Sequence, residues 1–119
     1  MDIPIDAAPQ RMQPYSAATQ AEAGLRDKKR LVSVGNFKNE TDRPLVLYLE
    51  MLCAEVHLSP GHEVELLGMA SPELLPISVS VSDGSVTVYP QRVFDPEWHV
   101  RFKGKLIPAG WPTRLSEHE

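Results

Sequence analysis

The residues best suited to metal chemistry lie close together between positions 53 and 69. A mononuclear copper site of the blue type uses two histidines, a cysteine and a weakly bound methionine, and this segment contains Cys53, His57, His62 and Met69. The period-two pattern of the segment places His57 outward and His62 inward, so the two imidazoles would not share one ion. We therefore predict no metal site here, and we interpret Cys53 as a small buried hydrophobic residue.

Two other kinds of chemistry are disfavoured for similar reasons. A metal site in a β-barrel needs histidine and glutamate side chains that face one interior; His62 does so, but His99 and Glu65 fall on predicted outward faces. The sequence contains no Gly-x-Ser-x-Gly segment and no glycine-rich phosphate loop. The serines of 78–82 alternate with valines, as on a solvated strand face. We predict no catalytic residue and no cofactor, and we favour a non-enzymatic protein.

An acidic surface is the more distinctive polar feature. The turn signal at 59–61 (Ser-Pro-Gly) predicts a hairpin between two short strands. Its register places Glu55 opposite Glu65 on the outward face, and His57 then lies opposite Glu63. Like charges directly opposed on a sheet are destabilising by roughly 0.2–1 kcal/mol. These four side chains are candidates for binding a basic partner; the favoured interpretation is an ordinary solvated face, balanced by Arg101 and Lys103 if that strand lies alongside.

The elements that must position these residues are short strands. From Leu31 onward the apolar residues recur with a period of two, which is typical of half-buried strands. The strand at 45–49 is apolar on both faces and is therefore expected to be central. Further strands are expected near 32–37, 55–58, 62–67, 78–82, 86–89 and 98–103, with a short one at 106–107. Seven or so strands without a convincing internal helix predict an all-β fold, a small antiparallel β-sandwich or barrel.

A second hairpin is predicted at Asp83-Gly84, a pair of residues that favours a type I′ turn. The register then places Val81 opposite Val86 and Val79 opposite Val88, with the serines on the other face. A charge at position 79 is expected to unfold the domain, because an unpaired charge is costly to bury. The predicted core contains Leu47, Leu49, Val64, Val79, Val88, Val100 and Phe102.

The first thirty residues differ from the rest and are expected to form an arm. Prolines interrupt its first half, and 17–30 could form a short helix. Ile3, Ile5, Met12 and Tyr15 are apolar anchors that suit an extended segment lying on a partner protein; a frayed terminus is the alternative. The expected organisation is an arm at 1–30, a β-domain at 31–108 and a C-terminal tail at 109–119, with the arm dispensable for folding but needed for association.

Composition narrows the class of partner. The 119 residues carry a net charge of −4 with only 12 lysines and arginines, which disfavours nucleic acid and anionic membrane surfaces as partners. The single cysteine makes no internal disulfide, and no apolar run approaches the roughly 20 residues that cross a bilayer. The N-terminal segment lacks the apolar region of a secretory signal. We expect a cytoplasmic protein, and we interpret the Asn39-x-Thr41 sequon as a polar turn.

One stretch resembles a known pattern. Residues 39–50 read Asn-Glu-Thr-Asp-Arg-Pro-Leu-Val-Leu-Tyr-Leu-Glu, and 58–61 read Leu-Ser-Pro-Gly. The polar turn, the Arg-Pro-Leu start, the leucine-rich strand and the Pro-Gly hairpin resemble a pattern in small uncharacterised bacterial proteins with compact β-sandwich folds. The chain departs from that pattern at 51–53, where Met-Leu-Cys stands in place of Pro and Trp. The resemblance implies a β-sandwich and carries no activity with it.

The function that these features favour is a protein-interaction module without catalytic activity. An accessory subunit, an inhibitor or an immunity-type protein would combine an arm, a doubly apolar strand and an acidic hairpin, and its partner would be another protein or a second copy of the chain. The alternative is a β-barrel that binds a small ligand or a metal; a protein of this kind could also be an enzyme.

Overall fold

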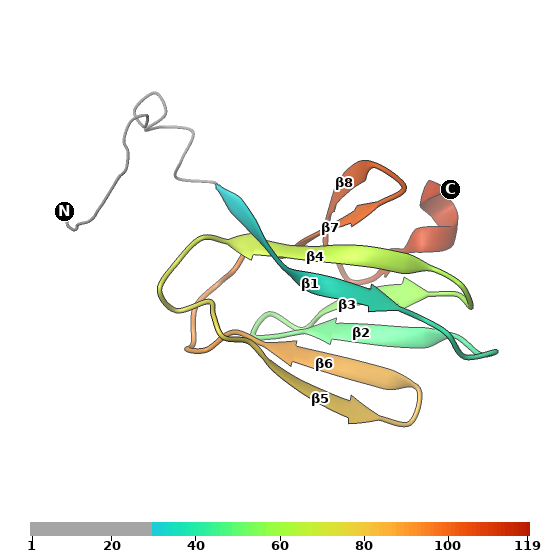
Figure 1. Cartoon of the computed structure of the whole chain (residues 1–119), viewed down its shortest axis with the longest axis horizontal. Coiled ribbons are helices and arrows are strands. Elements are labelled where there is room, and N and C mark those ends of the chain that lie inside the picture. Colours follow the sequence, from blue (N-terminus) through green and yellow to red (C-terminus); the bar gives the residue numbers. More distant parts are fainter. Residues whose placement is uncertain (1–29) are drawn as a thin grey trace. The chain divides into compact units, whose positions relative to one another are not determined.

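The computed structural model describes residues 30–119, and residues 31–119 form one compact unit. The arm at 1–30, its expected helix and the anchors Ile3, Ile5, Met12 and Tyr15 lie outside the described residues, apart from Arg30. Within 30–119 the regular structure consists of strands and one short 3₁₀ helix, and the strands are arranged in two sheets (Figure 1). The prediction of an all-β domain is therefore confirmed.

The first sheet has four strands in the order β1-β4-β7-β8, and every neighbouring pair is antiparallel. A two-residue turn joins β7 to β8, and both of its residues have positive φ, 51° at Lys103 and 82° at Gly104. Positive φ at both positions is the signature of a type I′ turn, whose twist matches that of the strands. The strands are β1 (Leu31–Lys38), β4 (Glu63–Met69), β7 (His99–Phe102) and β8 (Lys105–Pro108).

The second sheet has five strands in the order β5-β6-β2-β3-β9. The pairings β5–β6 and β2–β3 are antiparallel, whereas β6–β2 and β3–β9 are parallel. β2 lies in the middle of this sheet, as its doubly apolar sequence predicts. The elements are β2 (Leu45–Leu49), β3 (Ala54–Leu58), β5 (Ser78–Ser82), β6 (Ser85–Tyr89) and β9 (Thr113–Arg114), and a 3₁₀ helix, η2 (Leu115–His118), follows β9.

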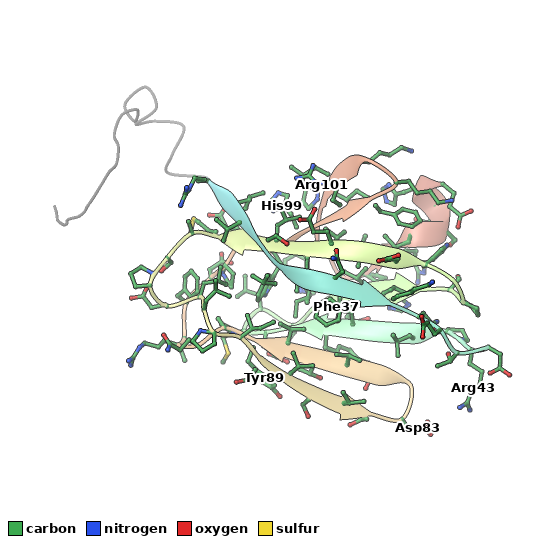
Figure 2. All side chains as sticks on the ribbon, viewed as in Figure 1. Phe37, Arg43, Asp83, Tyr89, His99 and Arg101 are labelled. Atoms are coloured by element: carbon green, nitrogen blue, oxygen red, sulfur yellow. The ribbon has the colours of Figure 1, made fainter. Side chains whose placement is uncertain are left out.

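The hydrophobic core lies between the inward faces of the two sheets. Alternate residues of β2 and β3 are buried, as the period of two requires, whereas β4 is buried at Val64 and continuously from Leu66 to Gly68. Phe37 of β1 packs against this core and points between the sheets (Figure 2). Six of the seven predicted core residues are buried, each at 1% exposure or less: Leu47, Leu49, Val64, Val88, Val100 and Phe102.

Val79 is the exception, and its predicted burial is wrong. Its side chain is 47% exposed, and Val81 beside it is 75% exposed. The predicted register is correct, with Val79 opposite Val88 and Val81 opposite Val86. However, β5 is the edge strand of the five-stranded sheet. Its valines therefore face inward without a strand of the four-stranded sheet to cover them. The turn also differs from type I′, because Gly84 has φ 80° whereas Asp83 is not among the described residues with positive φ.

The predicted hairpin at 59–61 is also wrong, because the strands on either side of it belong to different sheets. β3 pairs with β2 and β9, and β4 pairs with β1 and β7. The turn reverses the chain while carrying it from one sheet to the other. The expected inward faces still hold, because Val56 and Val64 are both buried. The period of two specifies which face is buried but not which strand lies alongside.

A buried asparagine connects this crossing turn to the polar turn before β2. Asn39 is fully buried, and its backbone bonds to both Gly61 and His62, at 2.8 and 2.9 Å. Its side-chain nitrogen donates to the carbonyls of Arg43 and Leu58, and its side-chain oxygen accepts from Thr41. Asn39-x-Thr41 is therefore a structural turn, as the sequence analysis predicted.

Candidate functional site

The residues predicted to form one acidic surface lie on two separate surfaces. Glu55 and His57 belong to β3, and their side chains bond to each other at 3.0 Å between His57 Nε2 and Glu55 Oε1. Glu63 and Glu65 belong to β4 in the other sheet, with Glu65 bonded to Arg101 Nε at 3.1 Å. The predicted opposition of like charges is therefore wrong, and the role of these four residues in binding remains a prediction.

Two neighbouring side chains stabilise the ionised carboxylate of Glu65. A hydrogen bond from the Ser33 side chain, and after it the bond from Arg101, lower the pKa of the Glu65 carboxyl below its ordinary value of 4.5. Arg101 is one of the basic residues that the solvated-face interpretation invoked to balance this strand, and Figure 2 shows it on β7. An ion pair of this exposure is typical of a solvated face.

The candidate metal ligands are likewise dispersed. Cys53 is exposed rather than buried, which corrects its interpretation as a core residue, and its thiol lies 3.7 Å from Glu50 Oε1. His62 is buried as predicted, with its ring edge-on to Phe102 and Nδ1 accepting from the backbone of Ser59. Its Nε2 therefore carries the proton and bonds to Glu119. Across residues 30–119, no group of three or more His, Cys, Asp or Glu could hold a metal ion.

A pocket that the sequence analysis did not anticipate lies where three connections meet. These are the segment 50–53 between β2 and β3, the segment 90–98 between β6 and β7, and the segment 109–112 between β8 and β9. The cavity has a volume of about 260 Å³. It is lined by Leu52, Ala54, Asp95, Glu97, Trp98, His99, Pro108, Ala109 and Trp111.

Both indoles of the chain line this pocket, and both are held by the same segment. Trp98 is buried and donates from Nε1 to the carbonyl of Glu50 at 2.7 Å. Trp111 is 67% exposed and donates from Nε1 to the carbonyl of Leu52 at 2.8 Å. Because both N–H groups already have acceptors, the rings offer mainly their π faces and apolar edges to anything that enters.

The polar residues that line the pocket are Asp95, Glu97 and His99, and the backbone of Glu97 bonds to the other two. The Glu97 backbone N–H donates to Asp95 Oδ1 at 2.8 Å, and the Glu97 carbonyl accepts from His99 Nδ1 at 2.7 Å. Glu97 has φ 50°, and Cys53 in the neighbouring segment has φ 59°. Left-handed backbone at residues other than glycine is uncommon and is enriched at binding and catalytic sites.

Exposed apolar side chains flank the pocket on the 50–53 side. Met51 and Leu52 are 42% and 46% exposed, and Trp111 is bonded to the same segment. We call Met51, Leu52, Trp111 and the pocket beside them the loop-end surface. The sequence did contain a signal for it: the apolar stretch 51–54 follows Glu50 after the end of β2, and a tryptophan lies in a turn of small residues and proline at 109–112. Single isolated apolar residues are normal on a surface, but a cluster marks a contact site.

No helix within residues 30–119 is long and apolar enough to cross a membrane.

The chain was compared with family models, curated proteins and solved structures. No family model matches the chain, and neither a curated protein nor a solved structure is similar to it.

Proposed function

We propose that this protein is an interaction module without catalytic activity, and that it binds a partner protein through the loop-end surface. The observation that carries the proposal is the exposed Trp111, which bonds to the carbonyl of the exposed Leu52 and, with the buried Trp98, lines the pocket. Tryptophan is the residue most enriched among those that dominate binding energy at protein interfaces. Loops at one end of a rigid sandwich are also where such domains commonly bind.

The size of the pocket supports a side chain of the partner as its occupant. Pockets for small molecules and cofactors usually measure roughly 300–1,000 Å³. The pocket here, at about 260 Å³, is smaller. It suits one side chain inserted from a protein whose surrounding surface covers Met51 and Leu52.

The charge of the pocket supports a basic side chain. Two acidic residues, Asp95 and Glu97, are among the residues that line it, together with His99 and both tryptophans. Carboxylates pair with a cation, and an indole face attracts a cation with about 0.5–2 kcal/mol. We therefore assign the anchor of the partner to arginine or lysine, with arginine favoured because its planar group also stacks on indole.

The first experiment uses a minimal probe. N-acetyl-arginine methylamide is titrated into the ¹⁵N-labelled protein, with the citrulline analogue as an uncharged control of the same shape. We expect weak saturable shifts at the Trp98 and Trp111 indole resonances for arginine and much smaller ones for citrulline. The double variant Asp95→Asn, Glu97→Gln should abolish the difference. Equal shifts for both probes, or none, would overturn the assignment of a basic anchor.

The second experiment tests the surface with the full partner. A photoreactive amino acid at Leu52 should cross-link one protein in the native source, and Trp111→Ala should remove that cross-link. The matched control places the photoreactive group at Asp42, in the turn at the opposite end of β2. Cross-linking of the same protein from position 42, or none from position 52, would contradict the proposed surface.

A further inference from the structure

β5 offers an unpaired edge that is independent of the loop-end surface. It lies at the end of the five-stranded sheet, where it pairs with β6 on one side and, among residues 30–119, with no strand on the other (Figure 1). All five of its residues are exposed. An edge strand presents a row of unpaired N–H and C=O groups, and this row is a template for another strand.

The backbone groups at that edge belong to the two valines. The carbonyl of Gly84, directly before β6, accepts from Val46 of β2 at 3.1 Å, and the carbonyl of Val88 in β6 accepts from Glu50, directly after β2, at 2.9 Å. Because successive residues of a strand direct their backbone groups to opposite sides, Ser85, Thr87 and Tyr89 direct theirs toward β5. Their partners in β5 are the three serines. The N–H and C=O groups of Val79 and Val81 therefore face the open edge.

The other sheet edges carry features that discourage pairing with a further strand, whereas β5 carries none of these features. β1 has an irregularity between Ser33 and Gly35 and ends in Lys38. β8 carries Lys105 and Pro108, and β9 is only two residues long. Charges, prolines, bulges and shortness are the usual protections of an edge. β5 contains neither charge nor proline, and its register with β6 is unbroken.

The sequence of β5 is the same in both directions, Ser-Val-Ser-Val-Ser. An antiparallel pairing of two copies about Ser80 therefore places Val79 opposite Val81 of the other copy, and each serine opposite a serine. The backbone N–H and C=O groups of Val79 and Val81, which face the open edge in one copy, then lie opposite the same groups of the other copy. The exposed valines also come together on the inward face, where cross-strand pairs of β-branched residues are stabilising.

We propose that β5 pairs with β5 of a second copy of this chain, antiparallel and with the two-fold axis at Ser80, so that the two five-stranded sheets become one continuous sheet. The contact is small for a permanent dimer. It therefore forms in a concentration-dependent way. Val79 and Val81 exchange two hydrogen bonds each with the partner copy, and the Ser80 pair is the closely spaced, non-hydrogen-bonded pair at the axis.

Single-cysteine variants of the full chain test the register in a Cys53→Ser background. In a closely spaced pair the Cα atoms are about 4.5 Å apart, so Ser80→Cys should form a disulfide-linked dimer on mild oxidation. Ser78→Cys and Ser82→Cys are the matched controls. In a dimer of one variant, the two introduced cysteines lie roughly 14 Å apart along the strand and should not cross-link. When the Ser78→Cys and Ser82→Cys proteins are mixed, a copy of one should cross-link to a copy of the other.

Hydrogen exchange and sedimentation test the same pairing without cysteines. As concentration rises from low micromolar toward millimolar, exchange at the Val79 and Val81 amides should slow, while the Ser80 amide is protected throughout by β6. Sedimentation equilibrium should show a monomer–dimer equilibrium that Val81→Lys shifts to monomer and that the control Val93→Lys, also at an exposed valine, leaves unchanged. A chain that is monomeric at every concentration, valine amides protected without dimer formation, or Ser78→Cys cross-linking as readily as Ser80→Cys would each overturn the proposal.

Discussion

Asn39 shows how much one buried polar residue contributes to the connectivity of this fold. Its amide donates to the carbonyl of Arg43 in the turn before β2 and to that of Leu58 at the end of β3, and its backbone bonds to residues 61–62 in the turn after β3. A buried polar group is inexpensive only while all its partners are present. Asn39 therefore fixes the turn that carries the chain from β3 in one sheet to β4 in the other.

The first prediction concerns this residue. Asn39→Ala removes the amide and takes from the buried Leu58 carbonyl its side-chain donor, so the free energy of unfolding should fall by about 2 kcal/mol or more. Urea denaturation measures it. Asn36→Ala is the matched control, because Asn36 is exposed on β1 and its loss should change stability by about 0.5 kcal/mol or less. Equal effects of the two substitutions would contradict the structural role of Asn39.

The contact between His62 and Glu119 predicts a dependence of stability on pH. The hydrogen bond from His62 lowers the pKa of the Glu119 carboxyl below 4.5, its ordinary value, and the charge of Lys103 acts in the same direction. A carboxyl whose pKa is lower in the folded state stabilises the protein above the unfolded pKa, and this contribution is lost as the pH falls through the folded pKa.

Glu119→Gln should therefore destabilise the protein at neutral pH but not at pH values well below 4.5. Chemical denaturation of both proteins across that range measures the difference, which should shrink steadily on acidification. Glu117→Gln, at an exposed glutamate of η2, controls for the loss of a charge. A difference between wild type and Glu119→Gln that is constant with pH would show that the carboxylate itself does not carry the stabilisation.

At the scale of the element, β5 and β6 show that pairing and burial are separate properties. Val79 and Val88 are directly opposite each other in the hairpin, yet Val79 is 47% exposed and Val88 is fully buried. The difference arises because β6 lies under the other sheet and β5 extends beyond it. The five-stranded sheet is wider than the four-stranded one that covers it.

This difference predicts opposite outcomes for the same substitution on neighbouring strands. Val88→Asp places an unpaired charge in the core and should unfold the domain. Val79→Asp leaves the charge in water and should cost about 1 kcal/mol or less, mostly through the poor strand propensity of aspartate. Circular dichroism and thermal unfolding measure both. Unfolding of the Val79→Asp protein would contradict the edge position of β5.

At the scale of the whole molecule, the two proposed contact surfaces draw on different parts of the sandwich. The loop-end surface is built from the segments 50–53, 90–98 and 109–112, whereas β5 spans Ser78–Ser82. Variants of one should therefore leave the other unchanged. Trp111→Ala should not alter the monomer–dimer equilibrium, and Val81→Lys should not alter the shifts produced by the arginine probe.

The compact unit at 31–119 makes the expected role of the arm testable. A protein that starts at residue 31 should keep its melting temperature, because the buried cluster of the described residues lies entirely between Leu47 and Leu115. Binding of the truncated protein to the partner that cross-links from position 52 measures the predicted contribution of the arm to association. A fall of several degrees in melting temperature would show that residues 1–30 belong to the fold.

The sequence by itself determined the all-β class, most strand positions and the inward faces. These depend on local properties: an alternation of apolar and polar residues such as that of 98–103 specifies which face is apolar, and a turn signal such as Asp83-Gly84 specifies where the chain reverses. Val100 and Phe102 were placed in the core on this ground alone, and both are buried.

The tertiary structure decided which strands are neighbours and which segments meet. Glu55 and Glu65 were expected to oppose each other, but the turn between them crosses from one sheet to the other. The pocket joins side chains from three connections, among them Leu52, Trp98 and Trp111, whose proximity follows from sheet order. Local periodicity carries no information about sheet order, because several arrangements bury the same faces. The choice among them rests on long-range contacts such as those of Asn39, which only the folded chain brings together.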